Sequence, residues 1–467
     1  MCVSRLPMFV SLLLASVFTS AAALSADAAD GKRPNIVFFL TDDQPQVGLG
    51  CMGNRHIQTP NMDRLAAEGV LFTNAFVTTS ICACNRATIL TGQHMRRHGI
   101  EDFQKPLSAE AFAKTYPMLL KQAGYRTGYL GKFAIGWPKA DIRHLSLPAD
   151  QFDFWYGFPQ TIDFRQTENG QVRYLTTVMT EKAVEFFRHS PADRPFCLTV
   201  ALKEPHGPWN YFDPDVPDIY ADATIPPPAT FTQEAFDSLP DFIQDSLSGG
   251  TGRRWLQKPE QYQQWIRTDY RLITRADIAV GRIMDALREH GFDRDTVVIF
   301  TSDNGEFQGA HGLTGKWLMY EESIRVPLIV RDPRLPPSRR GQRCEEMALS
   351  IDLAPTMLGL AGVPIPDTMQ GRDLGPLVRG EGVTWREDWY YEHTYAHPPQ
   401  HRIPKTEGVR TKQWKYTRYT DFTPPYEQLF NLAADPQELK NLAGDPAQAA
   451  VLDGLRGRCD EYRQTLR

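Results

Sequence analysis

Residues 35–43, NIVFFLTDD, and residues 296–305, TVVIFTSDNG, decide the fold of this chain. Each segment is an apolar run of strand length that ends in polar residues able to do chemistry. Near-continuous apolar runs of this length are typical of strands buried on both faces, as in a parallel sheet covered by helices. The two segments therefore predict two strands of one buried sheet, each with carboxylates at its carboxyl end.

Two further segments repeat this design, and helical segments separate the strands. Residues 125–130 (YRTGYL) precede Gly131 and Lys132, and residues 196–202 (FCLTVAL) precede the sequence KEPH at 203–206. Strands that alternate with helices predict right-handed βαβ units and a doubly wound α/β sheet flanked by helices. Helical spacing of apolar residues, with glycine after several of the segments, predicts helices over residues 60–68, 116–123, 177–189 and 259–290.

Ligands of doubly wound sheets bind outside the carboxyl ends of the strands, so the polar clusters should face one crevice. Asp42, Asp43, Asp303 and Asn304 offer there the hard oxygen ligands that Ca²⁺ or Mg²⁺ prefers. Either pair alone would be an ordinary turn or helix-capping sequence. Two pairs at one sheet edge gather like charges that need a cation to offset them, which favours a metal site.

A predicted helix that begins beside two cysteines brings the second part of the candidate site. Residues 82–86 read CACNR, and the sequence predicts a helix over residues 84–91 that ends before Gly92. A thiol or its derivative at a helix N-terminus meets the positive end of the helix dipole, where an anion also binds. Arg86 would project over the same place. Without the neighbouring motifs, two structural cysteines and a surface arginine would be the better explanation.

Lys132, His206 and Lys316 supply further positive charge and a proton donor. Each of them alone would be an ordinary solvated or structural side chain. Beside a metal and Arg86, they would clamp a tetrahedral anion. A site with a metal, a nucleophile position, cations and an acid suits the transfer of a phosphoryl or sulfuryl group to water.

These motifs resemble those of the formylglycine-dependent sulfatases, a family of the alkaline-phosphatase superfamily. The resemblance implies an alkaline-phosphatase-like mixed sheet and Ca²⁺, or Mg²⁺, bound by residues 42, 43, 303 and 304 together with the modified residue 82. The matching segments keep the family's order along nearly the whole chain and are residues 33–44, 59–69, 82–92, 119–132, 300–307, 319–327, 350–371 and 429–442.

The resemblance also implies a role for each candidate residue. Cys82 would be oxidised to formylglycine by a formylglycine-generating enzyme, and the hydrate of that aldehyde would attack sulfur. Arg86 would fix the hydrate and neutralise charge. Lys132, His206 and Lys316 would bind sulfate oxygens, with His206 or Lys316 near the leaving oxygen. The implied activity is that of an arylsulfatase-type sulfuric ester hydrolase, acting on a sulfated glycan or a small sulfate ester.

Three departures from the family pattern leave alternatives open. The usual core, Cys-x-Pro-Ser-Arg or Cys-x-Ala-Ser-Arg, is here Cys82-Ala83-Cys84-Asn85-Arg86, a family histidine is replaced by Ala134, and residues 203–206 only approximate the usual segment. One alternative is a phosphatase or phosphonate monoester hydrolase on the same scaffold. Another is a catalytically inactive glycan-binding protein, with Cys82 unmodified or bonded to Cys84.

The chain divides into three predicted parts. Residues 1–28 predict a signal peptide, because the apolar run 8–18 is short and small residues follow it; an uncleaved anchor is the alternative. The signal implies export to the periplasm or secretion, with no membrane association after its removal. Residues 33–375 form the predicted catalytic domain. Residues 376–467 form a smaller α+β subdomain, with a small antiparallel sheet and a closing helix.

Two segments are the candidate selectors of substrate. They are the aromatic and proline-rich insertion 209–245 and the polar loop 392–405, which carries His393, His397, His401 and Arg402. The alternative for each histidine is that it only caps a loop. The 51 lysines and arginines against 56 aspartates and glutamates give a net charge of −5. This balance gives no reason to expect nucleic acid or an anionic membrane as a partner.

Overall fold

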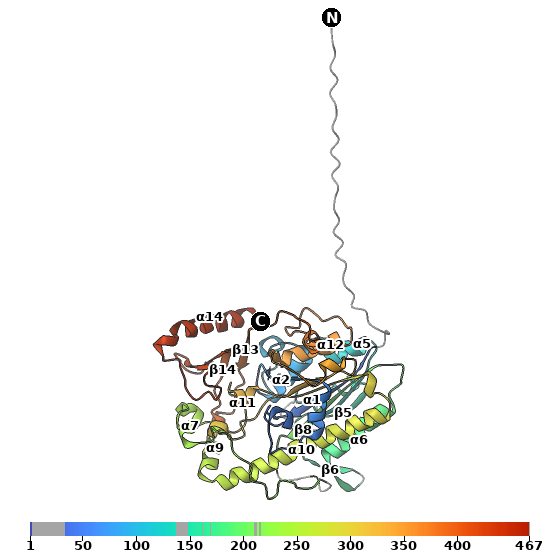
Figure 1. Cartoon of the computed structure of the whole chain (residues 1–467), viewed down its shortest axis with the longest axis horizontal. Helices are drawn as coiled ribbons and strands as arrows, with labels where there is room; N and C mark the ends of the chain where they lie inside the picture. Colours follow the sequence, from blue (N-terminus) through green and yellow to red (C-terminus); the bar gives the residue numbers. More distant parts are fainter. Residues whose placement is uncertain are drawn as a thin grey trace. The chain divides into compact units, whose positions relative to one another are not determined.

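An eight-stranded mixed sheet forms the centre of the unit Pro34–Arg467 (Figure 1). Its strand order is β11-β2-β10-β9-β1-β8-β4-β5. In that order the strands are Gln342–Cys344, Val70–Phe72, Leu328–Arg331, Thr296–Ser302, Asn35–Asp42, Phe196–Pro205, Arg126–Lys132 and Phe154–Phe158. The strands from β9 to β5 run parallel, whereas β10 pairs antiparallel with both β9 and β2. The predicted fold class, a doubly wound mixed α/β sheet flanked by helices, is confirmed.

The structure is a computed structural model that describes Met1 and residues 33–136, 148–160, 162–168, 170–209, 213 and 216–466. Apart from Met1, the predicted signal peptide at residues 1–28 lies outside the described residues, so it and the export it implies stay predictions. No helix in the described part of the chain is both long and apolar enough to cross a membrane.

The four predicted strands are present, and each continues beyond its apolar run into the polar cluster. β1 extends to Asp42, β4 to Lys132, β8 to Pro205 and β9 to Ser302. The ladder of backbone hydrogen bonds therefore sets the position of the polar residues: Thr41 pairs with Ser302, and Asp42 with Pro205. As a result, the residues that follow these strands emerge together at one edge of the sheet.

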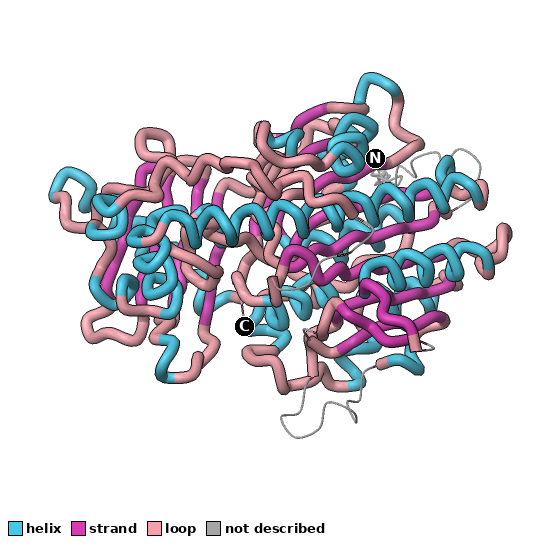
Figure 2. Tube along the Cα trace, turned by 90° about the horizontal axis from the view of Figure 1, so that it is seen from below, coloured by secondary structure: helices cyan, strands magenta, loops and turns pink. Residues whose placement is uncertain are grey.

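Helices cover both faces of this sheet, and Figure 2 shows helices that run beside its strands. The helices α1 (Pro60–Glu68), α6 (Leu175–Arg188) and α10 (Pro259–Glu289) share a core with Val37 and Phe39 of β1. On the other side, the core contains Ile36 and Phe38 of β1. Since alternate residues of β1 face two different cores, the strand is buried on both faces, as its sequence predicts.

The second core is formed by α2 (Cys82–Thr91), α5 (Tyr116–Gln122) and α12 (Leu353–Leu360). The other elements connect these layers or lie at their margins. They are β3 (Ala75–Phe76), β6 (Arg165–Glu168), β7 (Gln171–Tyr174), β12 (Ala348–Leu349), α3 (Met95–His98), α4 (Ala109–Ala113), α7 (Gln233–Asp237), α8 (Asp241–Gln244), α9 (Leu247–Gln257), α11 (Glu321–Ile324) and α13 (Gly375–Arg379).

The C-terminal part contains a four-stranded antiparallel sheet and a closing helix, as predicted. Its strands follow one another in space as in sequence. The helix α14 lies beside this sheet (Figure 1). It packs on the sheet through Leu452, Leu455 and Cys459, which lie in one core with Tyr390 and Tyr416. The elements are β13 (Asp388–His393), β14 (Thr406–Thr411), β15 (Trp414–Tyr419), β16 (Tyr426–Asn431) and α14 (Ala449–Thr465). The boundary at residue 375 stays a prediction.

One detail of that prediction is wrong. The aromatic pattern of residues 408–419 predicts one short strand, but β14 and β15 are two strands that pair antiparallel. The turn between them is held by Thr411, whose hydroxyl accepts hydrogen bonds from the amides of Gln413 and Trp414. Because neither glycine nor proline marks this turn, the local sequence carries none of the usual turn signals.

Candidate active site

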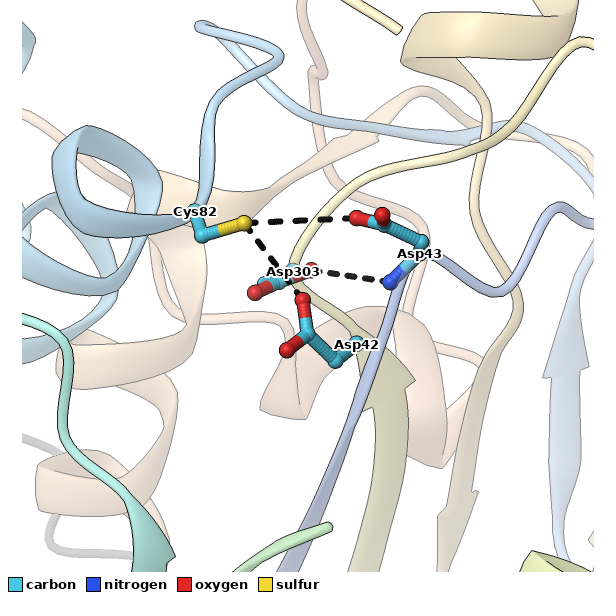
Figure 3. Close-up of side chains that lie close together, drawn as sticks. All are labelled: Asp42, Asp43, Cys82 and Asp303. Carbon is cyan, nitrogen blue, oxygen red and sulfur yellow. Dashed lines mark hydrogen bonds between the residues drawn. The ribbon is translucent and has the colours of Figure 1, made fainter. Parts of the chain in front are cut away.

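The candidate site lies where β1, β9 and α2 meet. Asp42 is the last residue of β1, Asp43 follows it, Asp303 follows β9, and Cys82 is the first residue of α2. Each of these four residues offers one ligand atom, and the four atoms all lie within 4.8 Å of one another. Figure 3 shows the Cys82 sulfur pointing toward the carboxylates of Asp42 and Asp43.

The helix α2 begins at Cys82 and not at Cys84 as predicted. Its first hydrogen bond runs from the amide of Asn85 to the carbonyl of Ile81, at 2.9 Å. Ile81 is extended and provides no side-chain cap, so the sequence has no capping signal at the start of this helix. The Cys82 side chain therefore sits at the N-terminus of the helix itself, where the helix dipole favours negative charge.

The oxygen atoms of the cluster fit a divalent cation. Asp42, Asp303 and Asn304 are fully buried. The Asn304 amide nitrogen donates to Asp43 Oδ1 at 2.5 Å and to the Gly305 carbonyl at 3.1 Å, whereas its Oδ1 atom has no hydrogen-bond partner among the described residues. A buried oxygen without a partner beside three carboxylates is the donor set that a hard cation such as Ca²⁺ takes.

Three cationic side chains enclose the carboxylates. Lys132 contacts Asp42 through its ammonium group. Arg86 donates to Asp303 Oδ2 from Nε at 2.8 Å and lies at 2.7 Å through Nη2. Lys316 contacts Asp43, and its Nζ atom lies 2.8 Å from the Cys82 sulfur.

His206 lies at the margin of the same group, with Nε2 at 3.9 Å from Asp43 Oδ2 and a side chain that is 30% exposed. The structure thus brings together every residue that the sequence proposed for the metal and the catalytic group: Asp42, Asp43, Cys82, Arg86, Lys132, His206, Asp303, Asn304 and Lys316.

Electrostatics separate the protonation states of these groups. Burial, reinforced by Asp42, raises the pKa of the Cys82 thiol to about 12. Burial and Asp42 also raise the pKa of Asp303 to about 6. Against the effect of burial, Lys132 and the other cations hold the pKa of Asp42 well below its usual value. At neutral pH the unmodified Cys82 is a neutral thiol, which is a poor nucleophile.

Polar residues that the sequence analysis did not assign also surround the site. The Asn85 amide nitrogen donates to the Asp303 carbonyl at 2.5 Å. Glu306 is buried and accepts a hydrogen bond from the Gly315 amide at 2.5 Å, and burial, together with Asp43, raises its pKa well above the usual value. Asn85 lies in the CACNR motif, and Glu306 directly follows the TSDNG motif. Their place in or next to these motifs is the sequence signal that could have identified them.

Part of the predicted selector loop lies beside the catalytic group. Trp317 directly follows Lys316, and its ring lies 5.5 Å from that of His397. The Tyr395 ring is 4.5 Å from His397, and His393 Nε2 is 2.9 Å from His397 Nε2. Trp317, Tyr395 and His397 are half-buried. These three side chains, here called the aromatic wall, border the Lys316 segment.

A mixed sheet with buried carboxylates, cations and a nucleophile position at one edge suits the hydrolysis of an anionic ester. Two family matches make the assignment specific: sulfatase over residues 34–363, and the C-terminal family of N-sulphoglucosamine sulphohydrolase over residues 309–465. The chain belongs to the sulfatase family and is a sulfuric ester hydrolase.

Individual relatives agree with this assignment. The chain is 29% identical to an N-acetylglucosamine-6-O-sulfatase of Bacteroides thetaiotaomicron, over 92% of this chain and 86% of that protein. A solved sulfatase-fold structure in complex with its substrate, D-glucosamine-2-N,6-O-disulfate, matches with a TM-score of 0.80 and 26% identity, covering 93% of this chain and 98% of that one. The phosphonate monoester hydrolase of Agrobacterium radiobacter, at 22% identity and a TM-score of 0.77, covers 93% and 96% and shares the fold.

Proposed function

We propose that this protein removes sulfate from a sulfated carbohydrate, with residue 82 acting as formylglycine and Ca²⁺ held by Asp42, Asp43, Asp303 and Asn304. The observation that carries the proposal is the cluster of four ligand atoms within 4.8 Å, enclosed by Arg86, Lys132 and Lys316. Bound Ca²⁺ would polarise the sulfate oxygens and offset the buried carboxylates. Mg²⁺ is the other hard cation that this donor set accepts.

The modification of Cys82 gives the proposal its nucleophile. As a cysteine, this residue is a neutral thiol, because burial and Asp42 raise its pKa to about 12. As the hydrate of formylglycine, residue 82 would instead present a hydroxyl at the start of α2. A formylglycine-generating enzyme is therefore the partner that maturation requires. The predicted signal peptide would direct the export of the chain.

The cations of the site would bind and orient the sulfate group. Arg86 and Lys132 already face carboxylates from buried positions, so they are preorganised to contact an anion placed among them. Lys316, whose Nζ atom lies 2.8 Å from the Cys82 sulfur, is placed to contact the hydrate of residue 82 and a sulfate oxygen beside it. His206, which is partly exposed, is the candidate for contact with the oxygen that departs with the sugar.

The aromatic wall and the named relatives support a carbohydrate as the substrate. Sugars present C–H faces that pack against aromatic rings, and hydroxyl groups that pair with imidazole nitrogens. Trp317, Tyr395 and His397 offer both kinds of contact next to Lys316. A sulfated amino sugar, the substrate class of the relatives, fits a site with cations at one end and aromatic rings at its border.

Two measurements test this function. In the mass of the peptide that covers residues 82–86, formylglycine appears as the loss of one sulfur and two hydrogens with the gain of one oxygen. A free thiol at full occupancy, or a loss of two hydrogens across Cys82 and Cys84, would support the inactive alternative. The second measurement is the ratio of kcat/KM on N-acetylglucosamine 6-sulfate and 6-phosphate. A higher kcat/KM on the phosphate would mean that the enzyme acts as a phosphatase.

A further inference from the structure

The Tyr391 hydroxyl joins the two segments that carry Cys82 and Lys316. Tyr391 lies in β13, in the C-terminal sheet, and is fully buried. Its hydroxyl donates to the Trp317 carbonyl at 2.6 Å and accepts a hydrogen bond from the Ser80 amide at 3.3 Å. Trp317 directly follows Lys316, and Ser80 stands two residues before Cys82. One side chain outside the catalytic group therefore contacts the backbone on both sides of it.

The backbone at Trp317 depends on such support. Its φ is 82°, in the left-handed region that a bulky residue adopts only when the surrounding structure holds it. The bond from Tyr391 reaches the carbonyl of this residue. If the bond is lost, the Lys316–Trp317 backbone can relax, and the ammonium group of Lys316 moves with it.

The segment before Cys82 is held by the same strand. Glu392 donates its amide to the Thr78 carbonyl at 3.1 Å, and the Thr79 hydroxyl donates to the Glu392 carbonyl at 2.8 Å. The Ser80 hydroxyl donates to the Ser323 carbonyl at 2.9 Å. β13 thus forms a fixed frame for residues 78–80, and Tyr391 extends that frame to Trp317.

We propose that Tyr391 is a positioning residue that sets the distance between the Lys316 ammonium group and residue 82. This inference rests on the proposed function, in which Lys316 holds the sulfate group beside residue 82. An error of about 1 Å in the placement of such a group can cost roughly 100-fold in rate. Tyr391 itself does not touch the reacting atoms.

Tyr390 provides a matched control in the same strand. It is also fully buried, its hydroxyl donates to Glu407 at 2.6 Å and accepts from Arg96 at 2.8 Å, and neither partner belongs to the catalytic group. Tyr391→Phe and Tyr390→Phe therefore each remove one buried hydroxyl with two partners. Only the first change removes a bond beside Lys316.

The test measures kcat and KM per molecule of formylglycine, with conversion of residue 82 determined by mass, and amide hydrogen exchange in both variants. Tyr391→Phe should lower kcat by about 10- to 100-fold with KM within about twofold, and should speed exchange of the Ser80 amide. Tyr390→Phe should leave kcat within about twofold of the unchanged protein and the Ser80 amide protected.

Two outcomes would overturn the inference. The first is a Tyr391→Phe protein with unchanged kcat and unchanged protection of Ser80. The second is an equal loss of kcat in both variants, which would mean a general structural effect. If the unchanged protein turns over no sulfate ester, the proposed function fails. In that case the exchange rate of Ser80 alone decides whether Tyr391 holds this segment.

Discussion

Cys82 and Cys84 stand two residues apart at the start of α2 and have different surroundings. The Cys82 sulfur lies 3.4 Å from Asp42 Oδ1, whereas Cys84 lies in an apolar cluster with Ile81 and Met95. On a helix, residue 82 shares a face with Arg86 and residue 84 does not. These surroundings support the proposal that position 82 carries the chemistry, whereas Cys84 packs among apolar side chains.

We predict that Cys82→Ala and Cys82→Ser abolish turnover without unfolding the protein, and that Cys84→Pro preserves or improves maturation. Proline is tolerated at position 84 because the first helical hydrogen bond starts from the Asn85 amide. The measurements are kcat, the thermal midpoint and the converted fraction of residue 82. Activity in Cys82→Ala together with a dead Cys84→Ala would move the nucleophile by two residues.

Asp303 is the carboxylate that links the proposed metal to Arg86. We predict that Asp303→Ala abolishes Ca²⁺ binding, measured by titration calorimetry, and lowers kcat by at least about 1000-fold, since several charge contacts are lost at once. Asp295→Ala, an exposed position just before the other end of β9, is the control and should keep both properties. Full activity after exhaustive chelation would contradict the metal assignment.

His94 makes the stability of the protein depend on pH. Burial, with help from Arg96, lowers its pKa from 6.5 to about 3. Below pH 6.5 the unfolded chain takes up a proton that the folded chain excludes, so the contribution of His94 to the free energy of unfolding falls as the pH falls, until about pH 3. The slope from one such group is about 1.4 kcal/mol per pH unit.

We predict that His94→Gln lowers the slope of the free energy of unfolding against pH by about 1.4 kcal/mol per pH unit between pH 6 and 4. Denaturant titration at several pH values measures this slope. His56→Gln, at an exposed position, is the control. An unchanged slope in His94→Gln would show that His94 takes up its proton in the folded protein.

At the scale of elements, the polar residues at strand ends were predictable and the connections between strands were less so. An apolar run followed by a polar cluster is a local signal, which is why Asp42, Asp43 and Asp303 could be assigned to one sheet edge. The strands β2 and β11 have only three residues each. Their places depend on partners far away in the sequence, so no local pattern indicates them.

The start of α2 and the link through Tyr391 were missed for related reasons. Ile81 ends the preceding segment without a side-chain cap, so the sequence lacks the usual sign of a helix start. Tyr391 is one of several aromatic residues in β13, and only its three-dimensional partners distinguish it from Tyr390. Hydrogen bonds between distant segments leave no periodicity in a sequence.

A buried ion cluster joins the C-terminal sheet to Glu321, the first residue of α11, which lies five residues after Lys316. The Lys415 ammonium in β15 lies 2.9 Å from Glu321 and 2.7 Å from Glu438, and all three side chains are largely buried. Glu321 also pairs with Arg410 at 3.2 Å. Without Lys415, Glu438 would have no cationic side chain in contact among the described residues, whereas Glu321 would keep Arg410.

We predict that Lys415→Met lowers the free energy of unfolding by about 3 kcal/mol, at the low end of the range for a broken buried pair. The low end applies because burial already raises the pKa of Glu438 to about 7, so that this carboxyl can take up a proton. Lys412→Met removes two exposed ion pairs, with Glu346 and Glu387, and should cost less than about 1 kcal/mol. Equal losses in both variants would contradict the argument.

At the scale of the whole molecule, the catalytic part and the C-terminal sheet depend on each other. Trp389 and Tyr391 of β13 belong to the same apolar core as Ile36 and Phe38 of β1. We predict that residues 33–375 alone do not yield an active enzyme, because the cut exposes this core and removes the Tyr391 and Lys415 contacts. The measurements are soluble yield and kcat. A soluble monomer of residues 33–375 with unchanged kcat would show that the two parts are independent.

The long sequence separation between the partners of residue 82 also has a consequence in time. The contact of Ser80 with Tyr391 joins residues 311 positions apart. A ribosome that adds roughly 5 to 20 residues per second needs about 15 to 60 s to cover that distance. Until Tyr391 is synthesised, the strand that encloses the CACNR segment does not exist. The order of the strands along the gene thus sets a waiting period during which a modifying enzyme can reach the cysteine.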